Sequence, residues 1–200
     1  PAFFGKENPE PLGLFRILVG ALIVINFLND APFIADYYSN DGFVSNAAIP
    51  DVLRDYRFSL LDYVGSPVAV YALYVLLLLS AFFLTIGFKT RIAAAVTFIL
   101  VLSFQERNPM LLDSADTILR IMAFYLAVAD SGAAYSADSV LNKLKDKQQQ
   151  PFQQQRLIPK WQPLLIKFQT SVIYFFSGFA KAQGPLWANG TAAYYAVNNS

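Results

Sequence analysis

The chain has 200 residues, of which 56 % are hydrophobic and 14 % charged, against roughly 25 % charged in an average globular protein. The charge-free run 63–88 exceeds the roughly 20 residues that cross a bilayer, so the composition excludes an ordinary soluble domain and indicates an all-α integral membrane protein. Because cysteine and histidine are absent and the net charge is only +1, disulfides, thiolate nucleophiles, serine–histidine triads, histidine-bound metals and a polycationic nucleic-acid surface are excluded as well.

The first half of the chain predicts three spans. The first covers about 12–28 and carries Arg16 near its start; an acidic polar stretch, 29–62, follows, in which Pro50 begins a short interfacial helix. A second span is predicted over 66–88. The third, over 92–104, is short, so it is tilted, lies in thin membrane or is continued by the polar residues after it.

The second half predicts two more spans and part of another. A fourth covers 114–128, a basic, glutamine-rich loop that we interpret as a mobile cytoplasmic linker covers 138–160, and a fifth span covers 163–180. Residues 186–197 resemble the start of a sixth, so we expect residues 1–200 to be a single membrane domain cut from a longer chain. Continuous apolar runs favour this polytopic transmembrane helix bundle over a β-barrel.

The orientation follows from the basic residues. If the N-terminus, the turn at 89–91 and the glutamine-rich loop share one side, that side holds ten of the 15 lysines and arginines. The positive-inside rule then places the N-terminus in the cytoplasm. The acidic stretch 29–62, the region 105–116 and Lys181 consequently face outward together.

Polar side chains inside the predicted spans mark a candidate site, because ionisable groups in hydrocarbon face the bundle interior by default. Those that we single out are Arg16, Gln105, Glu106, Arg107, Asn108, Asp113, Asp116, Arg120, Asp130 and Lys181. Asp116 and Arg120 are four residues apart on one helix face, where they form either a structural ion pair or part of a cavity wall. Asp113 and Asp116 stand at a helix start, where carboxylates cap the helix; without histidine or a third clear acidic ligand, no metal site is expected.

Lys181 lies among aromatic and small residues, 174–182, with no acidic residue nearby in sequence. Withdrawal from water would favour its neutral amine, which is how a lysine becomes a general base. The alternative is an interfacial lysine whose ammonium reaches the headgroups. Beyond it, Trp187 suits a membrane interface, Gly190 indicates a turn and Thr191 could cap the helix that follows.

A series of short motifs runs along nearly the whole chain: Leu14-Phe-Arg16-Ile, Asp41-Gly42, Arg107-Asn108 with Asp113, Asp116-x-x-x-Arg120, Tyr135-Ser-Ala-Asp138, Tyr174-x-x-Ser-Gly-x-x-Lys181 and Trp187-x-x-Gly190-Thr191-Ala. In this order they resemble the HTTM (horizontally transferred transmembrane) family, the membrane part of vitamin K-dependent gamma-glutamyl carboxylases and of many bacterial relatives. The resemblance implies a helix bundle with an outward-facing cavity and a reduced, vitamin K-like quinone as cofactor.

In the carboxylases, a lysine that matches Lys181 deprotonates the reduced quinone, and reaction with oxygen then supplies the strong base for a lyase-type carboxylation. They also use a histidine near the position of Asn108, and this chain has none. The resemblance therefore implies a bacterial inner-membrane protein that binds a quinone-like molecule, with Lys181 as base and a protein or peptide substrate on the outer side. The residues expected to line the cavity are Arg16, Arg107, Asn108, Asp113, Asp116, Arg120, Trp187, Gly190 and Thr191. The alternative is a non-enzymatic membrane partner, or a maturation or immunity factor, in which the polar groups hold the bundle together.

Overall fold

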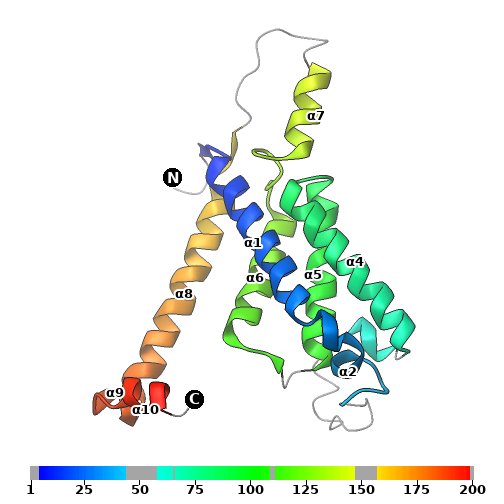
Figure 1. Ribbon diagram of the computed structural model, residues 1–200. Helices are drawn as coiled ribbons and strands as arrows, with labels where there is room; N and C mark the ends of the chain where they lie inside the picture. Colours follow the sequence, from blue (N-terminus) through cyan, green and yellow to red (C-terminus); the bar gives the residue numbers. More distant parts are fainter. Residues whose placement is uncertain (1–4, 44–57, 65, 109–110, 147–156, 199–200) are drawn as a thin grey trace. The chain divides into compact units, whose positions relative to one another are not determined.

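The fold is seen in a computed structural model that describes residues 5–43, 58–64, 66–108, 111–146 and 157–198 (Figure 1). These residues are mostly helical, which confirms the all-α class. Contacts divide the chain into a bundle unit, Pro1–Gln162, and a C-terminal unit, Pro163–Ser200. That residues 1–200 act as one membrane domain stays a prediction.

Four long helices form the bundle unit: α1 (Glu10–Asn29), α4 (Pro67–Ile86), α5 (Thr90–Arg107) and α6 (Ser114–Val128) (Figure 1). Helix α4 packs between α1 and α5, α5 packs on α6, and α6 returns to contact α1. Shorter elements complete this unit: β1 (Lys6–Glu7) paired antiparallel with β2 (Ile158–Pro159), η1 (Ala31–Phe33), α2 (Ile34–Tyr38), η3 (Leu60–Asp62) and α7 (Ala137–Asp146).

The C-terminal unit contains most of α8 (Trp161–Gln183), followed by α9 (Pro185–Ala188) and α10 (Ala192–Asn198). The predicted start of a sixth span is thus two short helices separated by a turn at Gly190, whose φ is +72°. A left-handed residue of this kind interrupts a helix, and glycine adopts it at no steric cost.

Local sequence signals set the helix ends. Ser66 accepts a hydrogen bond from the Ala69 amide at 3.4 Å, and Pro67 occupies the first turn of α4, where its missing N–H costs nothing. Gly87 ends α4 in the left-handed conformation with φ +71°. Asp113 begins α6 with a reciprocal capping box that includes Asp116.

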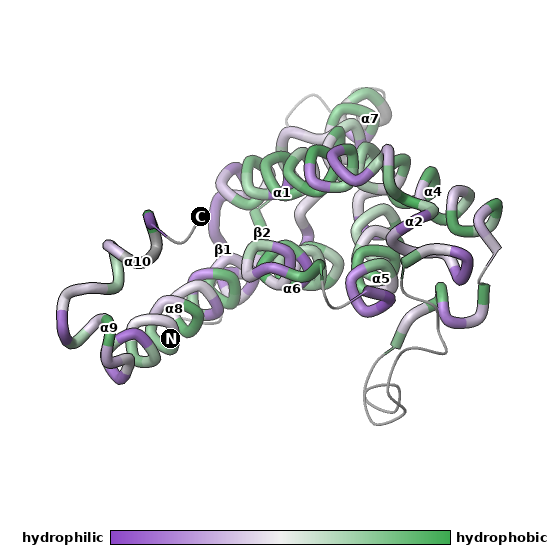
Figure 2. Tube along the Cα trace, turned by 60° about the horizontal axis from the view of Figure 1, so that its bottom comes forward, coloured by the Kyte–Doolittle hydropathy of each residue, from purple (hydrophilic) through white to green (hydrophobic). Residues whose placement is uncertain are grey.

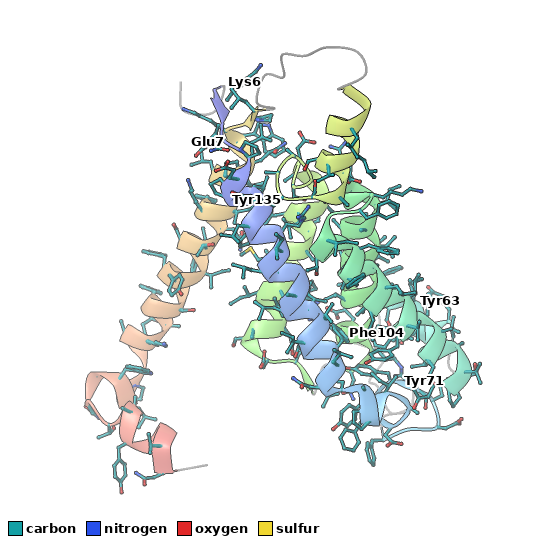
Figure 3. All side chains as sticks on the ribbon, turned by 45° about the horizontal axis from the view of Figure 1, so that its top comes forward. Lys6, Glu7, Tyr63, Tyr71, Phe104 and Tyr135 are labelled. Atoms are coloured by element: carbon teal, nitrogen blue, oxygen red, sulfur yellow. The ribbon has the colours of Figure 1, made fainter. Side chains whose placement is uncertain are left out.

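The core of the bundle unit is apolar and rich in aromatic residues. Phe104 is fully buried, with ring centroids 5.7 Å from Phe27, 5.0 Å from Tyr38 and 6.4 Å from Tyr74 (Figure 3). The Tyr74 hydroxyl donates to the Phe27 carbonyl at 3.0 Å, so even this phenol is satisfied inside the core.

The outward faces of α1 and α4 are also apolar, and both helices are mostly hydrophobic in Figure 2. Their exposed residues include Leu14, Leu18, Leu22, Ile25, Val75, Leu76, Leu79 and Phe82. A helix that is hydrophobic on all sides suits contact with lipid.

Among the described helices, α1 and α4 are the two that are long and apolar enough to cross a membrane. The prediction of about five spans is therefore not confirmed. Helix α5 carries charges at Arg91, Glu106 and Arg107, and α6 has only 15 residues. Since α5 continues through Gln105 and Glu106, the third predicted span is extended rather than short.

The predicted linker 138–160 is partly regular structure. Helix α7 occupies its first third, and β2 lies near its end. The glutamine-rich run 147–156 and the interfacial helix predicted from Pro50 lie outside the described residues.

Candidate functional site

A polar cluster lies where α1 and α5 end and α6 begins. We call it the Asp116 cluster; it comprises Asn26, Asp30, Tyr38, Gln105, Glu106, Asp116 and Arg120. Because three helices and α2 contribute to it, it forms only when the bundle is packed.

Asp116 connects three helices through hydrogen bonds. Its Oδ1 accepts from Asn26 Nδ2 at 2.6 Å, and its Oδ2 accepts from the Asp113 amide at 3.2 Å. Its main-chain carbonyl accepts from Gln105 Nε2 at 2.9 Å. The carboxylate therefore serves as a helix cap and as a tertiary acceptor at the same time.

Arg120 pairs with Glu106 of α5 through a short Nη1–Oε1 contact. The ion pair with Asp116, one of the two alternatives that the sequence leaves open for these residues, is therefore not formed. The Asp116 carboxylate instead accepts hydrogen bonds in the capping box and from Asn26. Arg120 pairs with Glu106 of the neighbouring helix α5.

Asp30, which is half-buried, and the buried Tyr38 form a donor–acceptor pair beside Asp116. The Tyr38 hydroxyl donates to Asp30 Oδ2 at 3.1 Å. The pKa of Asp30 is raised above its ordinary value, chiefly by burial. The hydrogen bond from Tyr38 lowers it in part, and the negative charge of Asp116 raises it further. Burial and the charge of Asp30 both raise the pKa of Tyr38, so its hydroxyl remains a donor.

Arg107 and Asn108 bind the last residues of α2 and the turn that follows it. The fully buried Arg107 donates from Nε to the Tyr38 carbonyl at 3.1 Å and from Nη2 to Asn40 Oδ1 at 3.0 Å. Asn108 Nδ2 donates to the Tyr37 carbonyl at 3.1 Å. Both side chains thus attach the C-terminal end of α2 to the end of α5.

Arg16 belongs to a separate polar cluster at the other end of the bundle. We call it the Arg16 cluster; it comprises Arg16, Gly87, Lys89, Thr90, Tyr135 and Asp138. Arg16 is fully buried and donates from Nη2 to the Tyr135 carbonyl at 2.7 Å, close to the start of α1 (Figure 3). Ten residues of helix, about 15 Å, separate Arg16 from Asn26. The structure therefore does not bring Arg16 together with the other predicted cavity residues.

Asp138 is the acceptor at the centre of the Arg16 cluster. It accepts from the Lys89 amide, the Thr90 amide and the Thr90 hydroxyl, each at 2.8 Å. Burial alone would raise the pKa of Asp138, but these hydrogen bonds and the charge of Arg16 lower it. Within the described residues, Nε and Nη1 of Arg16 have no hydrogen-bond partner.

Lys181 lies on the last turn of α8 with an exposed side chain, and its Nζ is 5.0 Å from the centroid of the Trp187 ring. Residues 163–200 contain two lysines and no acidic residue, so the C-terminal unit offers this cation an aromatic face and no carboxylate. The Thr191 hydroxyl donates back to the Leu186 carbonyl at 3.4 Å. The sequence analysis names Lys181 and Trp187 separately as site residues, and it does not predict that they contact each other.

Several members of the Asp116 cluster were not among the predicted site residues. Asn26 and Asp30 are polar residues at the end of an apolar helix, and a polar side chain inside a span is the signal that could have identified Asn26. Tyr38 carries no such signal, because tyrosines are common at membrane interfaces. In the part of the chain that the structure describes, no three acidic side chains are grouped to hold a metal ion.

Comparison with known proteins gives one match. The sequence model of the HTTM domain family matches residues 4–198. No curated protein and no solved structure was found to match the chain.

Proposed function

Because the chain belongs to the HTTM domain family, we propose that it is a quinone-dependent enzyme of the bacterial inner membrane in which Lys181 is the general base. In this proposal the membrane-associated chain crosses the bilayer about five times, with a cytoplasmic N-terminus. A reduced, vitamin K-like quinone binds from the outer side, where a protein or peptide substrate also approaches.

The observation that carries the proposal is the contact between Lys181 and Trp187. A reduced quinone presents a flat aromatic ring and hydroxyl groups at its edge, and an indole face beside an amine matches both features. Nζ is 5.0 Å from the ring centroid, which is within the range for a lysine ammonium above an aromatic face, and the quinol ring would take the place of this ammonium on the indole. Residues 163–200 contain no acidic residue, and the partner of Lys181 that is described inside this unit is the Trp187 ring.

Lys181 would act by accepting the hydroxyl proton of the bound quinol at Nζ, in its neutral form. Trp187 would hold the ring, and the bound quinol together with Tyr174, which lies two turns earlier on the same face of α8, would withdraw Nζ from water. Apolar surroundings favour the neutral amine over the ammonium. The reduced quinone, when bound, supplies the electrons for reaction with oxygen.

The experiment compares Lys181→Met, Lys181→Arg and Lys167→Met in the full-length protein reconstituted in nanodiscs, with reduced phylloquinone as the probe. We expect Lys181→Met to lose quinol-dependent oxygen uptake by about 100- to 10,000-fold, the usual contribution of a general base. Lys167→Met changes the other lysine of the same helix and should leave uptake unchanged. If Lys181→Met retains both quinol binding and oxygen uptake, the catalytic role is wrong.

A second candidate, a non-enzymatic membrane partner, is favoured by the Asp116 cluster. Its side chains bind one another: Arg120 pairs with Glu106, Asn26 donates to Asp116, and Tyr38 donates to Asp30. Groups satisfied in this way hold helices together. If Arg120→Ala and Asp116→Ala unfold the protein while Lys181→Met changes nothing, this candidate replaces the first.

A further inference from the structure

Helix α7 begins at the end of a helix that is able to span the membrane. The Asp138 amide donates to the Gly87 carbonyl at 3.0 Å, and Gly87 directly follows α4. Since α4 is one of the two described candidate spans, the base of α7 lies where that span leaves the hydrocarbon.

The base of α7 is fixed, while the rest of the helix extends away from the bundle. The three hydrogen bonds that Asp138 accepts from Lys89 and Thr90 attach the first turn to the connection between α4 and α5. Beyond that turn, α7 projects past the ends of α4 and α5 (Figure 1). Its outer part is therefore available for contact with something outside the bundle.

One face of α7 is apolar and uncovered. Val140, Leu141 and Leu144 are 55 %, 45 % and 59 % exposed. With 3.6 residues per turn, these three positions fall within about 100° of one another around the helix axis, and Asn142 falls on the opposite side. An apolar face with a polar opposite side is typical of a helix that lies on a membrane surface.

The charge of the surrounding sequence indicates which surface this is. Residues 143–160 contain five basic residues and one acidic residue. Basic residues beside an apolar helix face are attracted to anionic headgroups. If α4 crosses the bilayer, the membrane surface lies at this end of the bundle, next to the base of α7.

We propose that α7 is an interfacial helix whose face of Val140, Leu141 and Leu144 inserts into an anionic bilayer surface next to the end of α4. The partner is thus phospholipid with negative headgroups. This inference is independent of Lys181 and of any quinone, because it depends only on the membrane location of α4.

The test uses the absence of cysteine from the chain, so that a single introduced cysteine carries a spin label. Leu144→Cys places the label on the apolar face, and Asn142→Cys places it on the opposite face of the same helix turn. Both proteins are reconstituted in nanodiscs of phosphatidylcholine alone or with an equal share of phosphatidylglycerol. Collisions of the label with oxygen and with a water-soluble nickel chelate then report its depth.

At position 144 we expect a several-fold higher ratio of oxygen to nickel collisions than at position 142, and a further increase with phosphatidylglycerol. The apolar face of such a helix lies about 5–10 Å into the headgroup boundary, so the nickel chelate is excluded there. Equal water exposure at both positions would overturn the proposal. A label at 144 that neither reagent reaches would also overturn it, because a protein surface would then cover the face.

Discussion

Among single residues, Arg120 and Glu106 make the ion pair that joins α5 to α6 within the Asp116 cluster. Their side chains are 22 % and 24 % exposed, so the pair lies between the surface and buried classes of ion pair. We expect Arg120→Ala to lower the free energy of unfolding by about 1–3 kcal/mol, since a partly desolvated carboxylate loses its cation.

The control for Arg120 is Arg91, whose Nη2 is 3.9 Å from Asp130 Oδ1 with side chains 73 % and 38 % exposed. Arg91→Ala should cost less than about 1 kcal/mol, as exposed ion pairs do. Thermal unfolding in detergent measures both variants. Equal destabilisation by the two substitutions would contradict the structural role of Arg120.

Asp138 should make the bundle unit sensitive to acid. Its hydrogen bonds and Arg16 lower its pKa below the ordinary 3.8, so the unfolded chain binds its proton more readily than the folded chain. The stability from Asp138 is therefore complete above the ordinary pKa and is lost as pH falls through the folded-state pKa.

We expect Asp138→Asn to lower stability at neutral pH and to flatten the acid side of the stability profile. Unfolding free energies measured at a series of pH values test this. The control is Asp36→Asn, because Asp36 is exposed. A variant profile parallel to that of the unchanged protein would show that Asp138 does not carry this dependence.

The sequence predicts which residues are polar and buried better than it predicts their partners. Spacing places Asp116 and Arg120 on one helix face, but an i,i+4 pair contributes only about 0.2–0.5 kcal/mol. Asp116 instead binds the Asp113 amide at the start of α6 and the Asn26 side chain. Arg120 binds Glu106. These partners are stronger than the i,i+4 neighbour. Such contacts depend on the packing of three helices, which single-residue spacing does not contain.

Between elements, the joint of α4 and α5 depends on the absence of a side chain at Gly87. Its φ of +71° is strained for any other residue, and an added Cβ would overlap the Arg16 guanidinium and Ser136. Gly87→Ala should therefore cost left-handed strain of about 1–2 kcal/mol and a further 1–3 kcal/mol, roughly, for overpacking.

Gly190→Ala is the matched control, because Gly190 has nearly the same φ, +72°, and no atom within 4 Å of an added Cβ. It should cost only the strain, about 1–2 kcal/mol. Hydrogen exchange around each turn measures the local loss. Similar losses at both glycines would mean that the contact with Arg16 is not restrictive.

Helices that contain an apolar run could be located from the sequence, and the charged helix α7 could not. Helix α6 has the predicted bounds, and α1 and α4 differ from prediction by two residues or fewer at each end. Helix α7 was missed because its lysines and the glutamines after it favoured a linker. The signals for it were Asp138 in its first turn and the spacing of Val140, Leu141 and Leu144.

For the whole molecule, membership of the HTTM family and the apolar exteriors of α1 and α4 identify a membrane protein. Hydropathy alone does not decide whether α5 is a span, because this helix buries polar residues such as Thr97, Gln105 and Arg107 inside the bundle. Polar groups that face a bundle interior lower the hydropathy of a span without excluding it from the membrane.

The central claim, that a reduced quinone binds at Lys181 and Trp187, is tested most directly by photo-crosslinking. The full-length protein in nanodiscs is irradiated with a reduced azido-naphthoquinone, and the labelled residues are identified by mass spectrometry. We predict label between residues 174 and 191 that unlabelled phylloquinol displaces and that Trp187→Ala reduces. Label confined to the bundle unit, or label that phylloquinol does not displace, would contradict the claim.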